Sequence, residues 1–275
     1  MSGTVSLPVG SAFAPPVAAS TRQAAATLEA KDIFKHFGGI HALEGVSLQL
    51  RAGEVHGLIG PNGSGKTTLL NLLSGYYQPN SGGVQLDGED LSTGTVQHRS
   101  RLGIARTFQK PRLLPTLPVL DNAVLGAWPH ARAGFLATAF GLPWVGREDR
   151  ALRARAVELL HGVGLGHVLR RRANLLSHAE QRFLEIARGL AMRPRFILLD
   201  EPAGGLTGHE IENLGHVIRT LRDGGIGVLL VEHHTDFVFR VCDRVTTLNV
   251  GRVIKHGAPD EVRNDAEVIR VYLGA

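Results

Sequence analysis

A glycine-rich segment at residues 60–68, GPNGSGKTT, has the residue types and spacing that bind phosphate groups. Its glycines let backbone NH groups turn toward phosphate oxygens, and a helix starting at its end adds a favourable dipole. We predict that Lys66 neutralises the terminal phosphates and that Thr67 offers its hydroxyl to Mg²⁺. The residues predicted to contact the phosphates are Gly60, Pro61, Asn62, Gly63, Ser64, Gly65, Lys66, Thr67 and Thr68.

Acidic, imidazole and amide side chains follow three apolar runs further along the chain. FILLDEP places Asp200 and Glu201 after one run, VLLVEHH places His233 and His234 after another, and ARTFQK places Gln109 after a third. Two adjacent carboxylates at the end of a buried strand need a cation, which a nucleotide-bound Mg²⁺ supplies. We expect Asp200 to be coupled to Mg²⁺, Glu201 to activate the attacking water, and His233 to sense the γ-phosphate. The Gln109 amide is expected to bridge the metal and that water.

The segment LSHAEQ at residues 176–181 permits two interpretations. Ser177 and Glu180 have the spacing of a capping box, in which each side chain pairs with a free backbone NH at a helix start. Apolar residues then recur at i, i+3, i+4 and i+7 over residues 183–190, as on a buried helix face. The segment is either a capped amphipathic helix alone, or a helix whose first turn is half of a nucleotide site for another chain.

These groups need strands and helices to hold them. Short apolar runs with glycine turns predict strands within residues 28–58 and a strand pair at 82–91, GGVQLDGEDL. The leucines that follow Lys66 are expected to face a sheet. The runs RFILLD and GIGVLLVE are nearly all apolar, which is typical of strands buried in a parallel sheet. Residues 111–175 are rich in alanine, arginine and leucine, so we predict a helical insertion in an α/β domain.

Composition sets further limits. The chain has 275 residues, of which 43% are hydrophobic, so it can bury a substantial core. Residues 1–27 contain one base and no acid, and we expect a flexible N-terminal tail. The single cysteine, Cys242, rules out an internal disulfide. No run approaches the roughly 18 apolar residues of a membrane-spanning helix, although AGFLATAFGLPWV at residues 133–145 is either core or a patch for a membrane partner.

The net charge of +5 comes largely from arginine clusters. Such clusters attract nucleic acid in some proteins, but solvated helix surfaces carry them more often. We therefore expect no nucleic-acid partner.

The order of these motifs resembles that of the ATP-binding cassette ATPases. Within that class, HFGGIHALEGVSL, ARTFQKPRLLPTLPVLDNAVLGA, LEIARGLAMRPRFILLDEPAGGL, LLVEHHTDFVF and HGAPDEVRNDAEVIRVYLG resemble the ATPase subunits of branched-chain, or hydrophobic, amino acid uptake systems. The resemblance covers residues 28–275. It implies a RecA-like P-loop NTPase core with an N-terminal antiparallel β subdomain, an inserted α-helical subdomain at about 111–175 and a C-terminal tail at about 251–275.

The resemblance also implies partners and residue roles. The cofactors are ATP and Mg²⁺, and two ATPase subunits close head to tail around two ATP molecules. They drive two integral membrane permease subunits at the cytoplasmic face of the inner membrane, and an extracytoplasmic solute-binding protein delivers the cargo. By position, Phe37 stacks on adenine, Gln109 matches the Q-loop, and LSHAEQ matches the signature that binds the γ-phosphate of the opposite subunit's ATP, with contacts from Ser177, Ala179 and Glu180.

Two positions depart from the family pattern. His178 and Ala179 stand where the signature has glycines, or a bulky residue and a glycine. We expect Ala179 to keep its backbone NH donor while its methyl group faces the partner's P-loop and slows closure. Thr207 replaces the usual aspartate or asparagine of the D-loop, which puts the coupling between the two ATP sites in question.

Two other functions are also compatible with the sequence. One is a soluble ATPase of the same fold that acts on nucleic acid or the ribosome, and the other is a regulatory subunit that binds ATP but hydrolyses little. The transported solute is not encoded in these motifs. The second ATPase subunit is either another copy or a related chain, and we favour the related chain.

Overall fold

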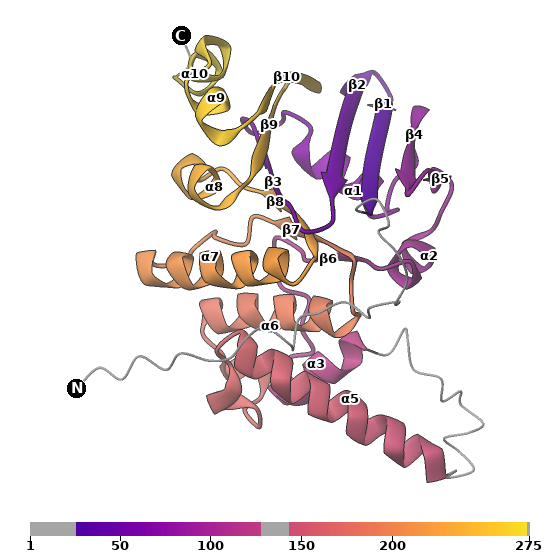
Figure 1. The fold of residues 1–275 in the computed structure, drawn as a ribbon, viewed down its shortest axis with the longest axis vertical. Coiled ribbons are helices and arrows are strands. Elements are labelled where there is room, and N and C mark those ends of the chain that lie inside the picture. Colours follow the sequence, from indigo (N-terminus) through magenta and orange to yellow (C-terminus); the bar gives the residue numbers. More distant parts are fainter. Residues whose placement is uncertain (1–25, 128–142, 274–275) are drawn as a thin grey trace.

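The computed structural model describes residues 26–127 and 143–273 (Figure 1). The expected N-terminal tail lies outside this part except for residues 26 and 27, and Thr27 already begins a strand. The strands are β1 (Thr27–Phe37), β2 (Ile40–Arg51), β3 (Val55–Ile59), β4 (Ser81–Leu86), β5 (Glu89–Asp90), β6 (Ile104–Arg106), β7 (Phe196–Asp200), β8 (Gly227–Val231), β9 (Arg244–Asn249) and β10 (Arg252–Gly257). The helices are α1 (Lys66–Leu73), α2 (Val96–Arg101), α3 (Val119–Gly126), α5 (Pro143–Gly162), α6 (His178–Ala191), α7 (Gly208–Asp223), α8 (Thr235–Val241), α9 (Pro259–Arg263) and α10 (Ala266–Leu273), with short 3₁₀ turns η2 (Gly166–Val168) and η3 (Ala173–Leu175).

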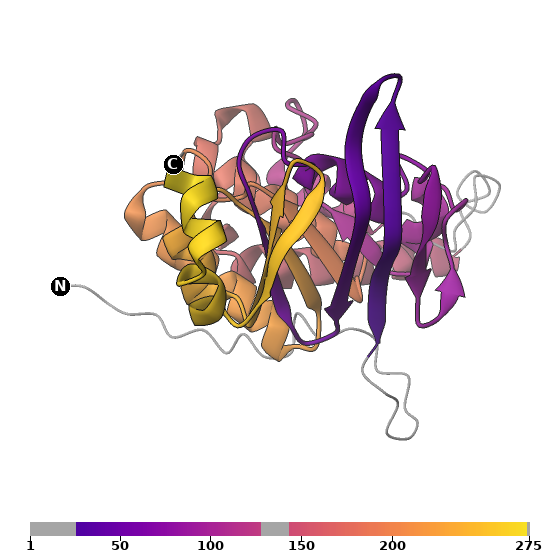
Figure 2. The same cartoon turned by 90° about the horizontal axis from the view of Figure 1, so that it is seen from above.

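One sheet is antiparallel and has the strand order β2-β1-β4-β5. Leu28 of β1 lies opposite Leu50 of β2 and Leu86 of β4, so apolar residues of three strands share one face. The register shifts beyond Ala30, where Asp32 has a φ of 46°, and this irregularity returns Ile33 to the buried face. In Figure 2 the long strands β1 and β2 stand beside the core sheet, which confirms the predicted N-terminal antiparallel unit.

The second sheet has the order β10-β9-β3-β8-β7-β6, and β9, β3, β8, β7 and β6 run parallel. The carboxyl ends of parallel strands meet at one edge, where α/β proteins bind ligands. Backbone bonds join the segments that leave this edge: Glu201 N donates to Val231 O at 2.9 Å, and Thr107 N donates to Leu198 O at 2.9 Å. The sheet therefore brings together the segments in which we predicted functional side chains.

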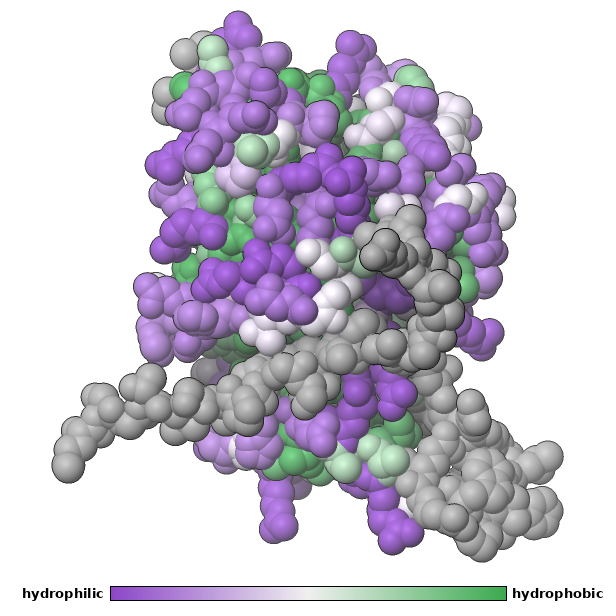
Figure 3. All heavy atoms as spheres, in the orientation of Figure 1, coloured by the Kyte–Doolittle hydropathy of each residue, from purple (hydrophilic) through white to green (hydrophobic). Residues whose placement is uncertain are grey.

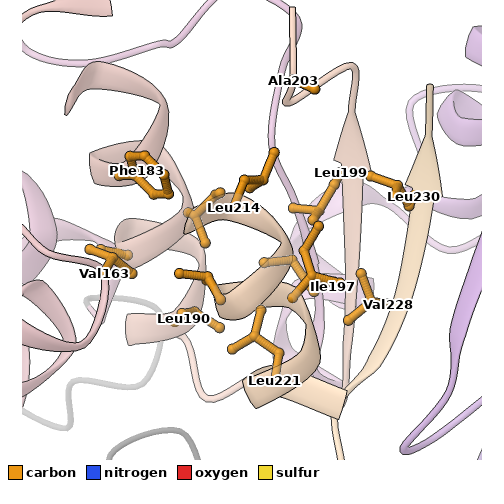
Figure 4. Close-up of a cluster of buried hydrophobic side chains, with 14 of the residues drawn as sticks. Val163, Phe183, Leu190, Ile197, Leu199, Ala203, Leu214, Leu221, Val228 and Leu230 are labelled. Atoms are coloured by element: carbon orange, nitrogen blue, oxygen red, sulfur yellow. The ribbon is translucent and has the colours of Figure 1, made fainter. Parts of the chain in front are cut away.

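Side chains alternate between the two faces of this sheet, and each face has its own apolar cluster. On one face, helices α6 and α7 cover β7 and β8 (Figure 4). The contributing side chains include Phe183 and Leu190 of α6, Leu214 and Leu221 of α7, Ile197 and Leu199 of β7, and Val228 and Leu230 of β8. On the other face, the four leucines of α1 are fully buried with Leu58, Leu198 and Leu229. Both predictions, buried strands and sheet-facing leucines after Lys66, are confirmed.

A helical unit lies beyond α7. Helices α3 and α5 pack against α6, and Figure 1 shows α7, α6 and α5 in successive layers. The Ala156, Leu159 and Leu160 side chains of α5 join the same apolar cluster as α6. Most of the apolar run at residues 133–145 lies outside the described residues. Among the described helices, none combines the length and the apolar character that crossing a membrane requires. The described surface seen in Figure 3 is mostly hydrophilic, with hydrophobic residues in small groups.

Arg99 of α2 is fully buried and braces the helix that leaves the glycine-rich segment. Its guanidinium donates to the carbonyls of Leu72 and Leu73 at the end of α1 and to Leu91 O. Burial lowers the pKa of Arg99 to about 10, and the Asp90 carboxylate opposes that shift. The forked guanidinium thus connects the end of α1 to the segment that precedes α2.

We expect Arg99→Lys to lower the free energy of unfolding by about 2 kcal/mol, because a lysine ammonium cannot span both groups of carbonyls and leaves a buried acceptor unpaired. Equilibrium urea denaturation measures this loss. Arg101→Lys, on the exposed side of the same helix, is the matched control. Equal stability of the two variants would contradict the bracing role.

Candidate functional site

The loop between β3 and α1 is shaped to receive phosphate. A side chain at Gly60 would place its Cβ 2.2 Å from Leu248 O, and one at Gly65 would place its Cβ 2.7 Å from Ala42 O. Both glycines have positive φ, so both space and backbone conformation require glycine. Ser64 Oγ is buried and has no hydrogen-bond partner among the described residues. A bound phosphate oxygen would supply that missing partner, so the loop fits the nucleotide phosphates.

Lys66 carries its charge inside this loop. Nζ donates to Gly60 O at 2.7 Å and to Pro61 O at 2.9 Å. Burial lowers the pKa of Lys66, and the nearby carboxylates of Glu201 and Asp200 oppose that shift. The ammonium is thus held beside the loop carbonyls, where it can also pair with a phosphate oxygen.

The remaining predicted loop residues lie at the mouth of the site. Asn62, Gly63 and Thr67 are exposed, and Thr68 is half-buried. The Thr67 hydroxyl is therefore accessible to an ion. Mg²⁺ prefers oxygen ligands. The Thr67 hydroxyl, the Asp200 carboxylate and the Gln109 amide oxygen are therefore a suitable ligand set.

Asp200, at the end of β7, is paired with an arginine that we did not predict. Arg106 Nη2 lies 3.0 Å from Asp200 Oδ2, and both side chains are 7% exposed. The other end of the guanidinium donates to Asn71 Oδ1 at 2.5 Å and to Ser74 Oγ at 3.0 Å, both in or next to α1. The Asp200 NH donates to Thr107 Oγ1 at 3.3 Å. One arginine thus connects the predicted metal carboxylate to the phosphate-loop helix.

The side chains of Glu201, Gln109 and His233 lie together just beyond the end of β7. Gln109 Nε2 donates to Glu201 Oε2 at 2.8 Å, and His233 Nδ1 lies 3.9 Å from the same oxygen. The Glu201 backbone has a φ of 48°, an uncommon conformation that redirects the chain directly after β7. The structure therefore brings together three residues that sequence analysis placed on different segments. A carboxylate held by an amide and facing an imidazole can accept a proton from water.

Glu232, which ends the β8 run, is a second buried carboxylate near this group. Its side chain is fully buried, and Oε1 accepts from Ala203 N at 2.6 Å. Oε2 accepts from His233 N at 3.2 Å and lies 3.4 Å from His234 Nδ1. Glu232 therefore fixes the loop after Glu201 relative to the two histidines.

Helix α6 holds the backbone around Gln109. Glu185 Oε1 accepts from Phe108 N at 3.0 Å, and Arg182 Nη1 donates to Phe108 O at 3.1 Å. Burial raises the pKa of Glu185, and the hydrogen bond from Phe108 opposes that shift. Two direct bonds thus join α6 to the residue beside Gln109.

Phe37 lies at the end of β1 as part of an exposed aromatic pair. Its ring meets that of Tyr77 edge to face at 5.2 Å between centroids, and Lys35 Nζ lies 5.0 Å from the Phe37 centroid. Two partly exposed rings next to a cation form a surface on which an adenine can stack. Another tyrosine approaches the phosphate loop: burial raises the pKa of Tyr272 in α10 to about 12, and its hydrogen bond with the Gly60 backbone opposes that shift.

The capping box predicted for LSHAEQ is confirmed. Ser177 N donates to Glu180 Oε2 at 2.7 Å, and Glu180 N donates to Ser177 Oγ at 3.2 Å. Our expectation for the Ala179 methyl group was wrong. Ala179 is only 8% exposed and belongs to the apolar cluster of α6, because the second residue of this helix turns toward the chain's own core. His178 is the exposed residue, and a Cβ on Gly205 would lie 3.1 Å from its ring.

This orientation changes the effect expected from restoring glycine. Ala179→Gly removes a buried methyl group and a good helix former, so we expect stability to fall by about 1 kcal/mol. It provides no clearance at the surface, so ATP turnover should stay close to that of the unchanged protein. Thermal unfolding and steady-state turnover test both parts, with Ala191→Gly at the other end of α6 as control. A rise in turnover specific to Ala179→Gly would restore our original expectation.

Thr207 has a local structural role. Its NH donates to Glu210 Oε2 at 2.7 Å, and its hydroxyl donates to the same oxygen at 2.8 Å. These bonds lower the pKa of Glu210 and fix the start of α7. Thr207 thus occupies the position before the helix, where aspartate and asparagine are also favoured.

Sequence analysis missed Arg106, Glu232, Tyr77 and Tyr272. The first two had a signal, because each is a charged residue attached to an apolar run that predicts a buried strand. The two tyrosines had none, since their contacts with Phe37 and Gly60 join segments far apart in the chain.

Comparisons with known proteins agree with these observations. The ABC transporter family model matches residues 43–204, and the model for the branched-chain amino acid ATP-binding cassette transporter matches residues 252–275. The high-affinity branched-chain amino acid transport ATP-binding protein BraF of Pseudomonas aeruginosa is 38% identical over 249 residues, which cover 90% of this chain and 97% of that protein. LivG of Escherichia coli K12, of the same description, is 36% identical over 248 residues, which cover 90% and 97%.

Solved structures are similar as well. An ATP-binding cassette of an ABC transporter in its ADP conformation superposes with a TM-score of 0.79 at 30% identity, covering 91% of this chain and 99% of that one. A dimeric bacterial ABC transporter cassette gives a TM-score of 0.73 at 27% identity, covering 84% and 98%. The chain therefore belongs to the ABC transporter family, in which it is a nucleotide-binding ATPase subunit that energises transport through membrane permeases.

Proposed function

We propose that this subunit drives the uptake of branched-chain or related hydrophobic amino acids, with roles for its residues as follows. ATP phosphates bind to the loop of residues 60–68 with Lys66, and adenine stacks on Phe37. Thr67, Asp200 and Gln109 hold Mg²⁺, which supplies charge neutralisation at the phosphates. Glu201 accepts the proton of the attacking water, and His233 contacts the γ-phosphate. The observation that carries this assignment is the convergence of Gln109, Glu201 and His233 beside the buried Lys66.

The second half of each ATP site comes from another ATPase subunit. Ser177 and His178 are exposed at the start of α6 and Glu180 is half-buried, so a second chain can reach this helix start. This supports a head-to-tail pair with contacts from Ser177, Glu180 and the Ala179 backbone. The similarity to a dimeric cassette supports the same arrangement. The cassette spans residues 28–275 in this proposal, with its helical subdomain at about 111–175 and its C-terminal tail at about 251–275. A related chain as the second subunit remains our preference.

One of the two permease subunits docks on this chain beside Gln109. A cavity of about 290 Å³ lies between α2, α3 and α6, and the aromatic rings of Tyr76 and Phe108 line it together with Leu125 and Met192. Arg106, Arg188 and Glu185 add charges to its wall. An apolar cavity with a few charged groups suits a short helical segment of a partner. Docking there places this peripheral subunit at the cytoplasmic face of the inner membrane.

The substrate assignment depends on the C-terminal match and on the relatives' names. Residues 252–275 match the branched-chain family model, and BraF and LivG are described as branched-chain amino acid transport proteins. A ribose import ATP-binding protein of Rubrobacter xylanophilus is also 36% identical, but this chain covers 47% of it. The cargo is therefore best assigned from the matching C-terminal segment, and a solute-binding protein presents it from the other side of the membrane.

Uptake by proteoliposomes tests the proposal. The subunit is reconstituted with its permeases, its ATPase partner and its solute-binding protein, and labelled leucine, ribose and urea are supplied in parallel. We expect ATP-dependent leucine uptake that valine and isoleucine compete with, and none with Glu201→Gln in both ATPase positions. Uptake of ribose or urea alone would overturn the substrate class. ATPase stimulation by DNA or RNA that falls steeply with salt would instead favour a soluble enzyme acting on nucleic acid.

A further inference from the structure

The geometry points to a second metal site, for a borderline divalent ion such as Zn²⁺, formed by Glu232, His233 and His234 at the carboxyl end of β8. The proposed reaction uses only His233 of the histidine pair, and His234 has no role in it. The ligand atoms are Glu232 Oε2, His233 Nδ1 and His234 Nδ1, which all lie within 4.8 Å of one another. Three protein ligands with a water in the fourth position is a common zinc arrangement.

The distances between these atoms suit a common central ion. Zinc bonds to nitrogen and carboxylate oxygen of about 2.0–2.2 Å place neighbouring tetrahedral ligands about 3.3–3.6 Å apart. Glu232 Oε2 is 3.4 Å from His234 Nδ1 and 3.9 Å from His233 Nδ1. The two imidazoles are 4.3 Å apart between ring centroids, with an angle of 36° between their planes. A small rotation of the exposed His233 ring therefore completes the ligand set.

The carboxylate is already fixed for this role. Glu232 is fully buried, and its Oε1 accepts from Ala203 N at 2.6 Å, so Oε2 remains directed at the imidazoles. Such supporting hydrogen bonds orient metal ligands in known sites. The two histidines are half-exposed at 50% and 45% of their side-chain surface, so an ion can enter from solvent. Two imidazoles favour zinc over Mg²⁺, which prefers oxygen ligands.

Occupation of this site has a consequence for turnover that rests on the proposed function. His233 Nδ1 lies 3.9 Å from Glu201 Oε2, so the ion would bind next to the carboxylate proposed as the base. An ion there places positive charge beside the Glu201 carboxylate and fixes the His233 ring away from the γ-phosphate. We therefore expect zinc to inhibit ATP hydrolysis in the presence of excess Mg²⁺.

Calorimetric titration of the nucleotide-free, untagged full chain with Zn²⁺ tests the site without depending on activity. We expect one ion per chain, and Co²⁺ in its place should give the visible absorption of a four-coordinate centre. His234→Ala should weaken zinc binding at least about 10-fold, since even loss of a supporting group has that effect. His216→Ala, which removes an exposed histidine from α7, is the control and should bind zinc as the unchanged protein does.

Turnover then tests the consequence. His234→Ala should keep basal ATP hydrolysis and shift zinc inhibition to concentrations higher by the same factor as in the titration. Equal zinc affinity of His234→Ala and His216→Ala, or no zinc binding by the unchanged protein, would overturn the site. Absence of ATP hydrolysis with a normal titration would instead count against the proposed catalytic roles and leave the metal site supported.

Discussion

Replacing Glu201 with glutamine is expected to lower ATP turnover by at least about 10²-fold, because proton transfer by a positioned base contributes that much or more. Glutamine keeps the size of the side chain and can still pair with Gln109, so the fold and the approach of His233 should persist. Lys66 lies in a separate loop and keeps its two carbonyl partners. ATP binding should therefore remain, and only the chemical step should be lost.

Single-turnover measurement with labelled ATP separates these two effects, because it records bound and hydrolysed nucleotide in the same sample. Glu212→Gln is the matched control, since it removes one exposed carboxylate from α7 outside the site. A Glu201→Gln rate above about one tenth of the unchanged protein's would mean that another group activates the water. It would also favour Gln109 or His233 as the principal contact of that water.

The same variant reports on the signature. If the exposed start of α6 completes the site of a second copy, Glu201→Gln should form dimers with ATP that light scattering detects. Adding Ala179→Gly should not change this, because the Ala179 methyl lies in the core. Dimerisation only with both changes would contradict the orientation that the structure shows. Monomers in both cases would favour a related chain as the natural partner.

Much of the fold could be predicted from sequence because the signals are local. The runs FILL and GVLLV are entirely apolar and lie in fully buried strands, and the leucines after Lys66 share one helix face. The capping box of Ser177 and Glu180 spans three residues and is equally readable. The relative order of β3, β8 and β7 in the sheet was not readable, since it depends on pairing between distant segments.

Some residues of the candidate site could also be predicted from local signals, and others could not. Phosphate-loop residues and the pair Asp200 and Glu201 lie within short motifs, so residue type and spacing are enough to predict them. The sequence did not show whether the Ala179 methyl group faces the core or the surface, because this depends on how α6 packs. Arg106 adjoins an apolar run, but its role could not be predicted because its partners Asp200 and Asn71 are 94 and 35 residues away.

Arg106→Met should have the largest effect on stability. Arg106 and Asp200 are both nearly buried, and removal of one partner of a buried ion pair costs about 3–5 kcal/mol because the other charge remains without compensation. Methionine also leaves Asn71 Oδ1 and Ser74 Oγ without the donor they now have. We expect the free energy of unfolding of the nucleotide-free protein to fall by an amount in this range, measured by urea denaturation.

Binding of Mg²⁺ with ATP should restore part of this loss. If Asp200 is coupled to the metal, the ion provides positive charge that the variant lacks near that carboxylate, and ligand binding stabilises the folded state. The rise in melting temperature on adding Mg²⁺ and ATP should then be larger for Arg106→Met than for the unchanged protein. Arg112→Met is the control, because Arg112 lies over the same Phe108 ring at 4.3 Å but is exposed. An equal rise in melting temperature in all three proteins would mean that Asp200 is not coupled to the metal. Arg106 would then only connect α1 to β7.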